Sequence, residues 1–217
     1  MIVSRGRGYV FVHIPKTGGT ALALALEARA MADDILIGDT PKARRRRRRL
    51  KGIETRGRLW KHARLADAEG LITRDEMAQL FVFTLVRNPW DRLVSYYHWL
   101  RAQSFEHRAV ALAQKLDFAE FIAHPHTSNA IRSNPYGRYL RDPEGVERGD
   151  LLIRLEHLES DIAPLEAHLG FRLSPLARAN ASDRARDWRG YYTDAAAERV
   201  ARLCAEDIAR FGYRFEA

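Results

Sequence analysis

The sequence predicts an α/β fold with a central, mainly parallel sheet. Two segments carry this prediction, because each joins a continuous apolar strand to a short loop and then to a helix. These segments are Tyr9–Ile14 with Gly18-Gly19 and Ala21–Ala28, and Phe81–Val86 with Arg87-Asn88-Pro89 and Trp90–Arg101. Active sites of such folds lie at the carboxyl ends of the strands.

The remaining elements follow from apolar periodicity and from capping signals. Leu151–Leu155 and the shorter Ile35–Ile37 are expected to be strands. Thr20 is expected to cap the first helix, and Thr73 with Glu76 forms a capping box for a later one. Further helices are expected at Asp67–Leu71, Thr73–Leu80, Phe118–Ala123, Glu159–Leu169 and Ala195–Arg210, with an ordered loop over Pro125–Pro143.

The composition indicates one globular domain over residues 1–217, with a basic insertion loop around 38–58. A hydrophobic content of 46% excludes a disordered chain, and the single Cys204 excludes a disulfide scaffold or a cysteine-rich metal site. The N-terminal residues do not form a secretory signal, and no apolar run approaches the ~18 residues that span a bilayer. A cytoplasmic protein is expected, and its oligomeric state stays open.

The positive charge is concentrated in one run of arginines. Lys and Arg number 36 against 28 Asp and Glu, so the formal charge is +8, and without Arg44–Arg49 it would be +2. Like charges at this density repel, which predicts a solvated, mobile loop. Three interpretations remain open: no specific role, attraction of an anionic acceptor or surface such as an acidic polysaccharide or a lipid head group, or non-specific nucleic-acid binding.

The first loop has the chemistry of a phosphate or sulfate site. Lys16 supplies a charge, Gly18 and Gly19 let backbone N–H groups approach an anion, and Thr17 and Thr20 supply hydroxyls. The alternative is a Gly-Gly turn beside an exposed lysine. The lysine precedes the glycines, unlike in the nucleoside-triphosphate P-loop, and we find no Asp at a strand end that would hold magnesium.

The second loop offers a second anion site. Arg87 follows the second strand, and Ser95 lies eight residues later on the helix, so a guanidinium and a hydroxyl can grip one phosphate. The alternative for Arg87 is a helix-end ion pair with Asp91, and for Ser95 an ordinary helix serine.

These two loops resemble motifs of carbohydrate sulfotransferases that use 3′-phosphoadenosine 5′-phosphosulfate (PAPS), the group that includes heparan sulfate and chondroitin sulfotransferases. The run His13–Thr20 is similar to their 5′-phosphosulfate loop, and Phe83–Tyr97 to their 3′-phosphate motif. The resemblance excludes roughly residues 30–60 and continues through later segments, namely Arg154–Leu158, Asn180–Ser182, Tyr191–Thr193 and Asp207–Tyr213.

The resemblance implies a P-loop-like, three-layer α/β fold and sulfuryl transfer to a hydroxyl or amine, without a metal. It assigns Lys16, Thr17, Gly18, Gly19 and Thr20 to the 5′-phosphosulfate, and Arg87 and Ser95 to the 3′-phosphate. A late loop that closes over the nucleotide in similar enzymes implicates Arg184 or Arg186, either of which is otherwise an ordinary exposed arginine.

Transfer also needs charge neutralisation and a base. Lys16 is expected to neutralise the leaving phosphate, and His62 to be the catalytic base, because related sulfotransferases place a histidine in the corresponding segment. The alternative for His62 is a surface histidine. Its neighbours Lys61 and Arg64 are expected to lower its pKa and keep it neutral, whereas His13 is expected to be a packing residue.

The sequence therefore predicts a PAPS-dependent sulfotransferase that acts on a carbohydrate or glycolipid, with no specific nucleic-acid partner. Two other functions stay open: a nucleotide-dependent kinase of the P-loop type and a basic nucleic-acid-binding module. The acceptor itself is not specified by any motif.

Overall fold

A computed structural model describes residues 1–176, 185 and 187–216. The chain forms two compact units, each built from two stretches of sequence. The first unit comprises Met1–Val86 and Tyr136–Ala179, and the second comprises Arg87–Pro135 and Asn180–Ala217.

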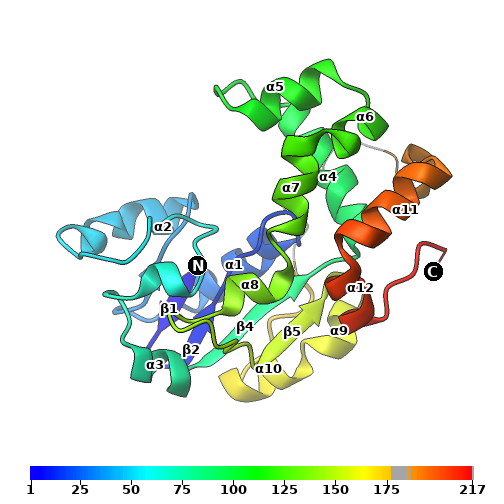
Figure 1. The fold of residues 1–217 in the computed structure, drawn as a ribbon. Coiled ribbons are helices and arrows are strands. Elements are labelled where there is room, and N and C mark those ends of the chain that lie inside the picture. Colours follow the sequence, from blue (N-terminus) through cyan, green and yellow to red (C-terminus); the bar gives the residue numbers. More distant parts are fainter. Residues whose placement is uncertain (177–184, 186, 217) are drawn as a thin grey trace. The chain divides into compact units, whose positions relative to one another are not determined.

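The first unit contains a five-stranded sheet with the order β3-β1-β2-β4-β5 (Figure 1). The strands are β1 (Ile2–Ser4), β2 (Tyr9–Phe11), β3 (Ile35–Leu36), β4 (Phe81–Val86) and β5 (Leu151–Arg154). β2 and β5 each pair in parallel with β4, whereas β1 is antiparallel to both β2 and β3. Four strands therefore run in one direction, which confirms the predicted α/β class; β1 was not predicted.

Both faces of the central strands are buried, which explains why their sequences are continuously apolar. Tyr9, Phe11 and Phe83 belong to a core cluster with α1 (Gly19–Ala28) and α10 (Ala163–Leu169). On the alternate positions, Val10 and Val82 are also fully buried. Beyond the last residue of β2, the N–H of Val12 donates to the carbonyl of Phe83 at 3.0 Å, so the pairing continues towards the first loop.

The other elements of the first unit surround this sheet. The capping box of α3 is confirmed, since Thr73 and Glu76 make both of its hydrogen bonds. The helix expected over Glu159–Leu169 ends at Leu169, where Gly170 has a φ of 73°, but it is divided in two at Ile162. These elements are α2 (Pro41–Arg46), η1 (Arg47–Leu50), η2 (Ala66–Ala68), α3 (Arg74–Gln79), α8 (Tyr136–Leu140), η3 (Leu155–His157) and α9 (Leu158–Asp161).

The prediction of a loop over the arginine run was wrong. Arg44–Arg49 lies in α2 and the 3₁₀ helix η1. Thr40 caps α2 by accepting a hydrogen bond from the Ala43 N–H, and Pro41 occupies the first turn. The Thr40 hydroxyl also donates to the buried Glu27 carboxylate at 2.6 Å. This anchor stabilises a helix that charge repulsion alone would disfavour.

Four local predictions also need correction. Gly18 rather than Thr20 occupies the N-cap of α1. The helix expected over 67–71 is a short 3₁₀ helix over Ala66–Ala68. The region Pro125–Pro143 is largely helical rather than a loop. Its first helix begins at Pro125, and the His124 side chain caps it by accepting from the N–H of His126. The long C-terminal helix is two helices, separated at Cys204.

The second unit is helical and has an aromatic core. Trp90, Tyr97, Phe118, Phe121 and Trp188 belong to its buried cluster. Its helices are α4 (Pro89–Arg101), α5 (Arg108–Lys115), α6 (Phe118–Ala123), α7 (Pro125–Arg132), η4 (Arg189–Tyr191), α11 (Asp194–Leu203) and α12 (Ala205–Phe211). In the described part of the chain, none of the helices has the length and apolar character needed to cross a membrane.

Candidate functional site

The first loop joins β2 to α1 through an unusual backbone. Lys16 has a φ of 66°, the one non-glycine residue with a positive φ in the described ranges, and Gly18 has a φ of 84°. A side chain in this region costs on the order of 1–2 kcal/mol, and such strain is concentrated at functional sites. α1 then begins at Gly19, so its first N–H groups point out of the helix end at this loop.

The two glycines are required for different reasons. A Cβ on Gly18 would lie 2.8 Å from Cδ1 of Leu155, and one on Gly19 would lie 2.3 Å from Cδ2 of the His13 ring. Gly18 also needs its left-handed backbone. The loop is therefore packed tightly on Leu155 and His13, and the close fit fixes its shape.

We expect Gly19→Ala to destabilise the protein by about 1–3 kcal/mol, because the added methyl group overpacks the site and displaces His13. His13 has little room to move, since its ring stacks on Phe11 and meets His62 edge-on. Urea unfolding would measure the loss. Gly38→Ala is the matched control in the same unit, because its Cβ would meet Ala43 at an ordinary 3.9 Å; equal losses in the two variants would contradict the prediction.

Thr17 stabilises the loop from within. Its side chain is fully buried, and its hydroxyl donates to the carbonyl of Ile14 at 2.9 Å. This bond closes the turn through the chain's own backbone. The hydroxyl proton is thereby committed to the loop, so the contribution of Thr17 to anion binding comes from holding the neighbouring N–H groups in place.

His62 lies against the base of this loop, 49 residues away in sequence. Its Nδ1 is 2.8 Å from the carbonyl oxygen of His13, and the two imidazole rings meet edge-on at 4.7 Å between centroids. A carbonyl oxygen only accepts, so Nδ1 carries the proton and Nε2 keeps its lone pair. This tautomer is the one that a general base needs.

Burial lowers the pKa of His62 to about 3. The rings of His13 and Trp60 cover it, with Trp60 edge-on at 5.1 Å. The positive charge of Lys61 acts in the same direction but is a smaller cause than burial. His62 is therefore neutral at physiological pH as predicted, but chiefly through desolvation rather than through basic neighbours.

His13 has the packing role that its position in the strand predicted. The side chain is 7% exposed, and burial lowers its pKa well below the usual value. Its ring lies between Gly19 of the loop and the ring of His62. His13 thus connects the loop to His62: its ring packs on Gly19, and its carbonyl accepts the hydrogen bond from His62.

Arg87 and Ser95 belong to the second unit. Nη2 and Nε of Arg87 donate to Oδ2 of Asp91 at 2.6 and 2.8 Å, and both side chains are 15% exposed. The ion pair considered as the alternative for Arg87 therefore forms. Such a pair also orients the guanidinium, so it is compatible with a phosphate contact. Ser95 is buried on α4, whose N-terminus Asn88 caps.

The last predicted contact, Arg184, lies outside the described residues, as does Arg186. Within the described ranges, no group of three or more His, Cys, Asp and Glu side chains gathers as a set of metal ligands.

Two residues of the site were missed by sequence reasoning. Leu155 packs under Gly18, and Trp60 covers His62 although its own side chain is 48% exposed. A tryptophan two residues before the candidate base is a signal that could have been read. Leu155 lies in the segment Arg154–Leu158 that resembles the family, but a leucine at a strand end does not by itself indicate a contact with the loop.

Comparisons with known proteins give a family match and a structural match. A model described as the sulfotransferase family matches residues 1–214. Among solved structures, mouse sulfotransferase SULT7A1 complexed with PAP aligns with a TM-score of 0.48 and 18% identity, over 93% of this chain and 84% of that one. A search of curated proteins found no significant match.

Proposed function

This chain belongs to the sulfotransferase family, and on that premise we propose that it transfers a sulfuryl group from PAPS to a hydroxyl or amine of a carbohydrate. The observation that supports this most is the contact chain from Gly19 through the ring of His13 to His62. It joins an anion-binding loop to a neutral histidine with an available lone pair.

The proposed reaction is an in-line transfer. The acceptor oxygen forms a bond to sulfur while the bond from sulfur to the bridging phosphate oxygen breaks. The acceptor proton goes to Nε2 of His62, and the electron pair of the broken bond stays on the leaving phosphate. The products are the sulfated acceptor and adenosine 3′,5′-bisphosphate (PAP), and His62 returns its proton to solvent.

The loop stabilises the charge that grows on the leaving phosphate. Lys16 supplies a full positive charge, and the N-terminus of the ten-residue helix α1 supplies N–H donors and a partial positive charge. Because Thr17 and the two glycines fix the loop before the donor arrives, these groups need little reorganisation during the reaction.

The 3′-phosphate of the donor is assigned to Arg87 and Ser95, as the resemblance implies. We expect Arg87→Ala to weaken PAP by about tenfold or more while leaving AMP, which lacks the 3′-phosphate, nearly unchanged. Calorimetric titration of both nucleotides would measure this difference. Arg199→Ala, an exposed arginine on α11 of the same unit, is the control. An equal loss of affinity for PAP and for AMP would contradict the assignment of Arg87 to the 3′-phosphate.

Donor choice tests the proposed function as a whole. PAP without magnesium should raise the melting temperature, and labelled sulfate should pass from PAPS to members of a panel of sugars, glycolipids and phenols. Stabilisation by ATP and magnesium alone would favour the kinase instead. Transfer to phenols and not to any sugar would keep the donor but contradict the carbohydrate acceptor.

A further inference from the structure

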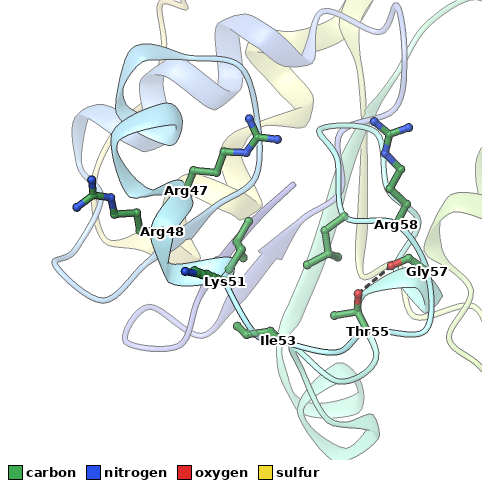
Figure 2. Close-up of a pocket in the computed structure, with 9 residues that line it drawn as sticks. Arg47, Arg48, Lys51, Ile53, Thr55, Gly57 and Arg58 are labelled. Atoms are coloured by element: carbon green, nitrogen blue, oxygen red, sulfur yellow. Dashed lines mark hydrogen bonds between the residues drawn. The ribbon is translucent and has the colours of Figure 1, made fainter.

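A groove in the first unit lies between η1 and the loop that follows it (Figure 2). It has a volume of about 550 Å³, within the range of small-ligand sites. Four of its nine lining residues are cations, and none is acidic; the four are Arg47, Arg48, Lys51 and Arg58. Figure 2 shows Arg47 and Arg58 on opposite sides of the hollow.

The first wall of the groove is held by two other arginines of the same run. Arg46 donates to the carbonyls of Met31 and Asp34 at 2.8 and 3.1 Å. Arg49 donates to the carbonyls of Ala32 and Asp34. Four of the six arginines therefore divide by role: Arg46 and Arg49 fasten the segment, and Arg47 and Arg48 line the groove.

The second wall is fastened by backbone pairing. The N–H groups of Arg56 and Gly57 donate to the carbonyls of Glu69 and Asp67 at 2.9 and 3.1 Å. Gly70 is in close contact here, since a Cβ on it would lie 2.1 Å from the carbonyl oxygen of Glu54. Both walls are thus formed before any ligand binds, which reduces the entropy cost of binding.

The cations of the groove have no acidic partner among the residues that the structure describes. Arg47, Arg48, Lys51 and Arg58 have no ion pair within the part of the chain that the structure describes. Residues 42–61 contain 11 of the 36 lysines and arginines but only one of the 28 acids, Glu54. A hollow lined by one sign of charge concentrates ligands of the opposite sign.

The candidate base follows the groove closely in the sequence. Leu59 lines it, Trp60 follows with a half-exposed indole, and that indole packs on His62. Leu59 and His62 are three residues apart, so their Cα atoms lie within about 11 Å. His62 therefore lies within reach of a chain-like ligand that fills the groove and leaves it at Leu59.

We propose that this groove binds the anionic groups of the acceptor, a carbohydrate chain that carries carboxylates or sulfates, and presents a neighbouring hydroxyl to His62. The inference rests on the proposed function and assigns the acceptor side of the same site. Guanidinium groups pair with carboxylate or sulfate oxygens in a fork, and the indole of Trp60 provides apolar surface for a sugar ring. The short span from Leu59 to His62 favours an acceptor over nucleic acid.

The test compares two double variants that remove the same charge. Arg47→Gln with Arg58→Gln removes one cation from each side of the groove. Arg44→Gln with Arg45→Gln is the control, because both arginines are exposed on α2 and neither lines the groove. Binding of labelled hyaluronate, dextran sulfate, neutral dextran and oligouridylate would be measured against salt, together with the PAP-induced shift in melting temperature.

We expect the groove variant to bind the acidic polysaccharides about tenfold more weakly than the wild type. The slope of log affinity against log salt concentration should fall by roughly two, because two fewer cations release counterions. The control variant should bind nearly as the wild type does. In transfer assays its acceptor KM should rise at unchanged kcat. Equal losses in both variants, or oligouridylate bound more tightly than either polysaccharide, would overturn the inference. If PAP did not raise the melting temperature of the wild-type protein, the proposed function itself would be contradicted.

Discussion

Lys16→Ala is expected to lower kcat for sulfate transfer at least ~100-fold, because it removes the full positive charge assigned to the leaving phosphate. The neighbouring N–H groups of α1 remain, so residual binding of PAP should persist at reduced affinity. Transfer of labelled sulfate under saturating PAPS would measure the change. Lys115→Ala, an exposed lysine at the end of α5, is the control.

The backbone at Lys16 separates this loss from unfolding. At a φ of 66° the backbone favours glycine over alanine, so Lys16→Gly should be at least as stable as Lys16→Ala. Both variants should be equally inactive. A glycine variant that is stable and retains activity would show that the charge of Lys16 is not used in transfer.

His62→Asn is expected to lower kcat by about 100- to 10,000-fold, the range of a lost general base. Asparagine retains an N–H near the position of Nδ1 and can still donate to the carbonyl of His13, but it has no basic nitrogen. In the wild-type protein, kcat/KM for PAPS, which reports the free enzyme, should not fall between pH 8 and 5 through protonation of His62, because its pKa is about 3. An acid limb near pH 6.5 would contradict this.

The same pKa predicts how stability responds to pH. His62 is neutral in the folded protein down to about pH 3, whereas in the unfolded chain it binds a proton below about pH 6.5. The unfolded state therefore binds more protons between these values, and His62 makes the wild type lose stability as pH falls from about 6.5 to 3. His62→Asn should show a smaller loss over this window in urea titrations. An identical pH dependence of stability in the wild type and in His62→Asn would contradict the lowered pKa of His62.

Several features of the fold could be predicted because their causes are local. β4 and α6 were predicted with the bounds that the structure gives, and Thr73 with Glu76 closes its capping box within four residues. The helical state of Arg44–Arg49 could not be predicted, because its stabilising contacts to Glu27 and to residues 31–34 are made across the fold.

The sequence by itself determined the strand–loop–helix units and the family motifs, from the order of apolar runs, glycines, Lys16 and Arg87 along the chain. Only the tertiary structure decided the state of His62, because its tautomer and pKa depend on a carbonyl 49 residues away and on the rings that exclude water from it. It also decided which arginines of the run hold the fold and which face the groove. Charge and hydrogen-bonding capacity belong to each residue, whereas desolvation and direction arise from packing.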